Sequence, residues 1–150
     1  MIKCETVGMI EVSKNNPLLT SEKDVANYDF ITVDELLYLI CNTIVGDDAY
    51  RDAVTIKAGE FLNGYQVDAW VGQKLVVDES HIAYADGKTY ADLKVADPDA
   101  DPAVEATLLT VNDEGKLAVA ASTPASGIYF KVTDKVTLTE KAVKVLVCAA

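Results

Sequence analysis

Two glycines in the stretch AGEFLNGYQ have a spacing that suggests phosphate chemistry. Gly59 and Gly64 are spaced as in the G-x-x-x-x-G-K-[ST] loop, in which a lysine contacts the phosphates and a hydroxyl holds magnesium. Tyr65 and Gln66 stand in the lysine and hydroxyl positions here, and the residues that follow alternate like a strand. We therefore predict a structural segment with no nucleotide cofactor. It should bend at Gly59 and form a hairpin turn at Asn63-Gly64, because Asn-Gly favours such turns.

Three aspartates farther along the chain are spaced like calcium ligands. Asp97, Asp99 and Asp101 match the first three ligand positions of an EF-hand loop. That loop would also need Gly and Glu where Pro102 and Leu108 stand. We therefore predict no metal site, with a weak calcium site in this loop left open.

His81 is the single histidine of the chain, and it follows three other residues capable of acid–base chemistry. Asp78, Glu79 and Ser80 do not converge on it within an extended segment, because adjacent side chains point to opposite faces. The chain also lacks the G-x-S-x-G elbow of a serine nucleophile. One histidine cannot build a zinc site that needs several. These observations predict that the protein is not an enzyme.

Aromatic residues suggest a second kind of site, a sugar-stacking surface. Aromatic side chains in strands more commonly fill cores or interfaces. A carbohydrate-binding or hydrolytic β-domain therefore stays open as an alternative function. The aromatic residues concerned are Tyr65, Trp70, Tyr84, Tyr90 and Tyr129.

The bulk composition limits the partners of the chain. Its 150 residues are 50% hydrophobic and carry a net charge of −11, which predicts one domain with a real core. The negative charge disfavours nucleic acid. The start MIKCETVGMIEVSK has no apolar signal region, and the longest apolar stretch, Leu36–Val45, is too short for a membrane span. Cys4, Cys41 and Cys148 are scattered, so we expect reduced thiols in a cytosolic product.

Short strand-like runs separated by turn residues dominate the chain. They predict a mainly β fold, a β-sandwich or a barrel-like arrangement. Asp86-Gly87 and the loop NDEG (112–115) are expected to be turns, as is TDK (133–135). The predicted strands are Ile2–Val12, Val54–Lys57, Tyr65–Val71, Lys74–Val77, His81–Tyr84, Thr107–Val111, Leu117–Ala121, Ile128–Val132, Val136–Thr139 and Ala142–Cys148.

One segment, ITVDELLYLICNTIVGDD, has the signals of an α-helix. Thr32 and Glu35 have the spacing of a capping box, and Gly46 supplies a stop. These signals predict one helix near residues 33–45. It is apolar over most of its circumference, so it should lie either in the core or in a subunit interface.

The stretch VADPDADPAVEA is the one break in composition. Its prolines and aspartates predict an exposed loop or a boundary between two sub-lobes at residues 95–104 of a single domain, 1–150. Six acidic residues and no basic one lie from Asp97 to Glu114. Basic residues gather near the end of the chain instead, an asymmetry that could orient contacts between copies. They are Lys131, Lys135, Lys141 and Lys144.

A family resemblance covers about a third of the chain. It rests on YDFITVDELLYLICNTIVGDDAY (28–50) and VTIKAGEFLNGYQVDAWVGQKLVVDESHI (54–82), and above all on I-x-A-G-x-x-L-x-G-x-x-V from Ile56 to Val67, followed by W-x-G-Q-K-L-V-V. These segments resemble accessory virion proteins of tailed phages and prophages of Gram-positive hosts. The similarity is to small head proteins of the decoration or cement type.

The resemblance implies a structural protein that is made in the host cytoplasm and binds the outside of the capsid. Its partners would be the major capsid protein and further copies of itself, with neither nucleic acid nor membrane involved. The N-terminal arm, residues 1–16, would reach the shell as an added strand. A tail or connector component is the nearest alternative. Candidate interface residues are Leu36, Leu39, Ile40, Phe61, Tyr65 and Trp70.

Overall fold

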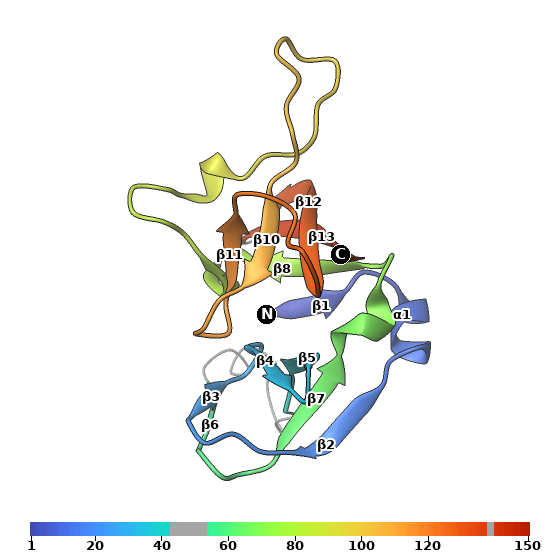
Figure 1. Cartoon of the computed structure of the whole chain (residues 1–150), viewed down its shortest axis with the longest axis vertical. Coiled ribbons are helices and arrows are strands. Elements are labelled where there is room, and N and C mark those ends of the chain that lie inside the picture. The colour runs from blue at the N-terminus through green and yellow to red at the C-terminus, as the bar shows by residue number, and fades with distance from the viewer. Residues whose placement is uncertain (43–53, 138–139) are drawn as a thin grey trace.

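The computed structural model describes residues 1–42, 54–137 and 140–150, and these form a mainly β protein, as predicted. The larger sheet has seven strands and the second has four (Figure 1). In spatial order the seven are β1 (Ile2–Cys4), β8 (Lys74–Asp78), β13 (Lys141–Ala149), β12 (Ile128–Thr137), β10 (Leu108–Val111), β11 (Leu117–Ala120) and β9 (Ile82–Ala83). The four are β2 (Asn15–Leu19), β7 (Leu62–Gln66), β5 (Leu36–Ile40) and β4 (Phe30–Val33), while β3 (Val25–Ala26) pairs with β6 (Thr55–Ile56).

Helical structure is short throughout the described residues. Their single α-helix is α1 (Val7–Glu11), and the 3₁₀ turns are η2 (Val67–Trp70), η3 (Glu79–His81) and η4 (Tyr90–Asp92). No helix in the described ranges is long and apolar enough to cross a membrane.

The predicted strand Ile2–Val12 is correct only in its first residues. β1 ends at Cys4, and the chain then turns into α1. A long-range contact holds this turn: the indole Nε1 of Trp70 donates to the Met9 carbonyl at 3.1 Å and to Ser13 Oγ at 3.0 Å. The predicted strand Tyr65–Val71 likewise gives way to η2 after Gln66.

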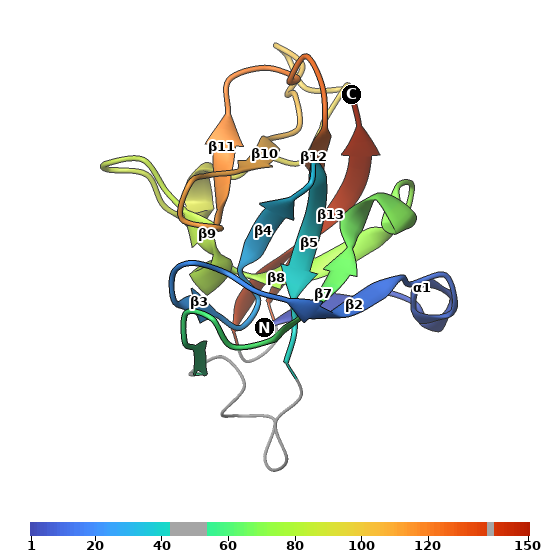
Figure 2. The same cartoon turned by 60° about the horizontal axis from the view of Figure 1, so that its bottom comes forward.

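Two hydrophobic clusters cover opposite faces of the four-stranded sheet. On one face Phe30 and Leu39 join the main core with residues of the seven-stranded sheet, and the rings of Phe30 and Phe130 lie 5.5 Å apart. On the other face Tyr38 and Ile40 pack with Leu19, Val25, Ile56 and Leu62. Figure 2 shows the four-stranded sheet in front of the seven-stranded sheet.

The predicted helix near residues 33–45 is wrong for the part that is described. Residues 30–40 form the antiparallel hairpin β4–β5, with Val33 opposite Leu36. Asp34 and Glu35 form its two-residue turn with φ values of 50° and 67°, the left-handed pair that a type I′ hairpin needs. The capping box of Thr32 and Glu35 is therefore not formed. Residues 43–45 of the predicted helix lie outside the described ranges.

The predicted hairpin turn at Asn63-Gly64 is also wrong, because both residues lie inside β7. Asn63 instead joins an amide network: its backbone N–H donates to Asn42 Oδ1 at 2.7 Å, and its side chain accepts from Asn15 at 3.1 Å. Gly64 leaves room for its neighbours, since a Cβ there would lie 2.4 Å from a methyl of Leu19. The bend at Gly59 is confirmed by its φ of 83°.

Of the other three predicted turns, two are confirmed and one is wrong. The loop 112–115 is confirmed as the β10–β11 hairpin, and Asp86-Gly87 as a tight turn with a φ of 77° at Gly87. The predicted turn at 133–135 is wrong, because β12 continues through it with a bulge between Val132 and Asp134. Thr133, one of the polar residues that had suggested a turn, is the extra residue of this bulge.

The acidic segment at 95–104 is an exposed loop that extends away from both sheets (Figure 1). Asp97 and Val104 pair across it through two backbone hydrogen bonds of 2.9 Å. At its base the Thr107 N–H donates to the Lys94 carbonyl at 2.9 Å. The loop is thus a projecting arm tied at two levels.

Replacing Glu35 by glycine tests the hairpin against the helix. In a type I′ turn Glu35→Gly removes a left-handed strain, so the free energy of unfolding should rise by about 1 kcal/mol. Inside a helix the same change would lower it by about 1 kcal/mol. Urea unfolding gives the sign, and Glu60→Gly is the control, because Glu60 is an exposed turn residue without a positive φ. A destabilised Glu35→Gly would contradict the hairpin.

Candidate functional site

An open groove of about 1160 Å³ lies between three segments far apart in sequence. Residues 20–25 form one wall, and residues 29–33, which include β4, form the floor. Residues 111–115 of the β10–β11 hairpin form the opposite wall. Loop residues and a strand edge thus surround a single hollow.

Gly115 fixes one end of this groove. The Phe30 N–H donates to the Gly115 carbonyl at 2.9 Å, which ties the β10–β11 loop to the edge of β4. Gly115 has a φ of 79°, and a Cβ on it would lie only 2.7 Å from the Phe30 carbonyl oxygen. Only glycine satisfies both the left-handed backbone and this close approach.

An ion pair strengthens the same junction. Lys116 Nζ lies 2.6 Å from Asp29 Oδ1, and the second oxygen of Asp29 accepts from the Ala26 N–H at 3.1 Å. Asp29 is buried. A charge-assisted bond at a partly buried site holds its geometry better than an exposed ion pair does.

The groove wall at residues 20–25 is tied to the neighbouring turn by Asp24. Its two oxygens accept from the Ala58 N–H at 3.0 Å and from Lys57 Nζ at 3.2 Å. The Ala58 amide, together with Lys57, lowers the pKa of Asp24 below its ordinary value. Across the groove, Lys23 Nζ donates to the Asp113 carbonyl at 3.2 Å.

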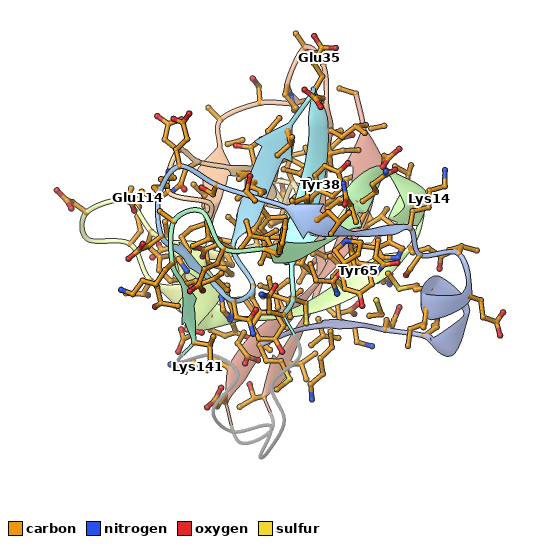
Figure 3. All side chains as sticks on the ribbon, turned by 90° about the horizontal axis from the view of Figure 1, so that it is seen from below. Lys14, Glu35, Tyr38, Tyr65, Glu114 and Lys141 are labelled. Atoms are coloured by element: carbon orange, nitrogen blue, oxygen red, sulfur yellow. The ribbon has the colours of Figure 1, made fainter. Side chains whose placement is uncertain are left out.

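The groove is acidic. Its lining holds five carboxylates and one lysine. Among the described residues, Lys57 and Lys116 pair with two of these carboxylates and Lys23 offsets a third charge, so the lining keeps two negative charges in excess. Asp34 and Glu35 are exposed on the adjoining hairpin, and Figure 3 shows Glu35 at its outer tip.

The other predicted chemistry is only partly brought together. His81 is buried, with its Nε2 2.7 Å from the N-terminal nitrogen of Met1 and its ring 5.6 Å from that of Tyr28. Asp78 accepts from the same nitrogen at 2.8 Å. Met1, Asp78 and His81 therefore make a structural cluster at the start of β1, while Ser80 is exposed.

The three aspartates with the spacing of calcium ligands lie on the projecting arm. Asp97 Oδ1 accepts from the Asp99 N–H at 3.2 Å, a local turn contact. Within residues 1–42, 54–137 and 140–150 no group of three or more potential ligands is placed to hold a metal ion. The three cysteines are half-buried.

The aromatic residues do not form one surface. Trp70 is buried and stacked on Tyr65, with ring centroids 6.0 Å apart, so its ring offers no open face to a sugar. Tyr90 lies under Lys135 and Lys141, at 4.7 and 5.7 Å from its ring. These contacts use the aromatic faces within the fold.

The candidate interface residues separate into core and surface. Leu39, Ile40 and Trp70 are 4%, 0% and 2% exposed, so they fill the interior of this chain. Tyr65 is half-buried, whereas Leu36 and Phe61 are 36% and 64% exposed. Of these six residues, Phe61 presents most of its apolar side chain to a partner, and Leu36 presents about a third.

Comparisons with protein-family models, curated proteins and solved structures find no match to this chain.

Sequence reasoning missed the groove, although two signals for its walls were present. One is the predicted NDEG turn, which contains Gly115. The other is the acidic run that contains Asp113 and Glu114. What the sequence could not give was the pairing of this turn with Phe30, more than eighty residues earlier.

Gly115→Ala should destabilise the protein far more than Gly87→Ala. Both glycines have a positive φ, but a Cβ at Gly87 meets nothing within 4 Å. The control should therefore lower the free energy of unfolding by about 1–2 kcal/mol, and Gly115→Ala by roughly a further 1–3 kcal/mol from overpacking. Urea unfolding measures both. Equal effects would show that Gly115 does not touch Phe30.

Tyr84 should titrate unusually late. Burial, followed by the charges of Glu79 and Tyr90, raises the pKa of Tyr84 to about 12, and no described residue makes a hydrogen bond with its buried hydroxyl. The unfolded chain ionises near pH 10. Stability should therefore fall as the pH rises from about 10 to about 12 and be unaffected by Tyr84 below that window. Tyrosinate absorbance should lose a step near pH 12 in Tyr84→Phe; an unchanged titration would contradict the assignment.

Proposed function

We propose that this chain is a virion structural protein that binds the outer surface of a phage capsid and stabilises the shell, as decoration proteins do. The segments that resemble such proteins supply most of the four-stranded sheet: β4, β5 and β7 all come from residues 28–82. The same segments supply β8 of the larger sheet. The resemblance therefore covers the part of the chain where the two sheets meet.

The observation that carries this proposal is a pair of exposed apolar side chains at the β2 edge of this sheet, one within β2 and one just before β7. Leu18 and Phe61 are 68% and 64% exposed. Each adjoins a buried leucine, and those two leucines, Leu19 and Leu62, pair directly across β2 and β7. Asn42 Nδ2 donates to the Phe61 carbonyl at 3.1 Å, so the backbone beneath the ring is fixed.

Large apolar side chains that the fold leaves in water favour a contact with another protein. An aromatic residue held on an ordered backbone loses little entropy on binding, which suits it as an anchor. A capsid offers many identical sites, and copies that associate with one another would bind several at once. A modest contact at each site then gives stable attachment. The major capsid protein is the partner that this proposal requires.

Co-sedimentation with purified capsids of the encoding phage or prophage tests the proposal. The unchanged protein should sediment with the shells and raise their resistance to heat. Leu18→Ser and Phe61→Ser should each weaken retention by about tenfold or more, because an anchoring side chain is lost.

Val119→Ser is the matched control. Val119 is an apolar residue, 54% exposed, on β11 of the other sheet, so its loss should leave capsid retention unchanged. If the unchanged protein stays in the supernatant, the decoration function is wrong. If all three variants bind equally well, Leu18 and Phe61 are not the contact.

A further inference from the structure

The edge of β4 that faces away from β5 is hydrogen-bonded at Phe30 and open at Thr32. The Ile40 N–H donates to the Asp29 carbonyl at 2.9 Å, and Ile31 and Val33 lie opposite Tyr38 and Leu36. Backbone groups of an antiparallel strand alternate in direction, so Ile31 and Val33 bond to β5.

Phe30 and Thr32 therefore direct their backbone groups away from β5. The bond from the Phe30 N–H to Gly115 confirms this direction for Phe30. Thr32 directs its N–H and C=O the same way, at a lining position of the groove. An added strand can form one pair of main-chain hydrogen bonds there, and Gly115 stops it from reaching Phe30.

The charge of the groove selects the kind of strand. Glu22, Asp113 and Glu114 are exposed carboxylates on its walls, and Lys23 is the single cationic side chain of the lining. A segment with basic side chains would meet carboxylates on both walls, whereas an acidic segment would be repelled.

We propose that this groove binds an extended, lysine- or arginine-rich segment of a partner protein, which adds to β4 as a strand at Thr32. The two main-chain bonds anchor the backbone of the segment at Thr32, and the carboxylates of the walls select its charge. Only one residue of β4 is open, so the affinity of a single site is weak and falls with salt. This site is separate from Leu18 and Phe61, and it does not depend on the decoration function.

A capped peptide of alternating lysine and valine, seven residues long, is the probe. Fluorescence anisotropy of the labelled peptide with the full chain should show saturable binding that weakens as salt increases. A twin with glutamate in place of lysine should not bind. A fully N-methylated twin keeps the charge but has no N–H groups, and should bind about five- to tenfold more weakly.

Variants of the protein locate the site. Thr32→Pro removes the outward N–H and none of the bonds to β5, at an edge position that tolerates proline. It should weaken binding about five- to tenfold, while Thr32→Val, which keeps the N–H, should bind like the unchanged protein. Glu114→Lys should weaken binding by roughly tenfold. Asp99→Lys on the projecting arm, with the same change of net charge, should have little effect.

Three results would overturn the proposal. The first is no binding of the lysine–valine peptide at low salt. The second is equal weakening by Glu114→Lys and Asp99→Lys, which would mean attraction to overall charge alone and remains decisive if Thr32→Pro does not fold. The third is a dimer in light scattering that Thr32→Pro dissociates, because the occupant of the edge would then be a second copy of this chain.

Discussion

The hydrogen bond from the Phe30 N–H to the Gly115 carbonyl is the contact on which this architecture depends. It joins the edge of the four-stranded sheet to a hairpin of the seven-stranded sheet, next to the ion pair of Asp29 and Lys116. The missing side chain of Gly115 allows the two backbones to approach. Behind the bond, the ring of Phe30 packs on Phe130 in the shared core. The same contact creates the groove and fixes where its open edge begins.

The mainly β character could be predicted because turn residues recur at short intervals and β-branched residues fill the runs between them. The helix prediction failed at β4–β5 for a definite reason. Hydrophobic clusters cover both faces of that sheet, so β5 has a continuous apolar run instead of an alternating one. Thr32 and Glu35 then matched a capping box, while the actual turn uses Asp34 and Glu35 in the left-handed region.

The candidate sites were harder to predict than the fold. The local motifs that suggested catalysis or metal binding are incomplete as sequence patterns. Three of the six candidate interface residues fill the core, because apolar character alone does not tell a core strand from a contact surface. The groove brings residues 20–33 beside residues 111–115, and no local pattern predicts such a pairing. Asn63-Gly64 shows the same limit, since tertiary contacts of Asn42 and Leu19 override its turn preference.

Hydrogen exchange at single amides of β4 tests the central claim most directly, namely that its edge is sealed at Phe30 and open at Thr32. Nuclear magnetic resonance resolves these amides. Phe30, Ile31 and Val33 should be protected, and Thr32 should exchange faster than its neighbours by roughly tenfold or more, because its N–H faces the groove. Protection of Thr32 equal to that of Ile31 and Val33 would contradict the account.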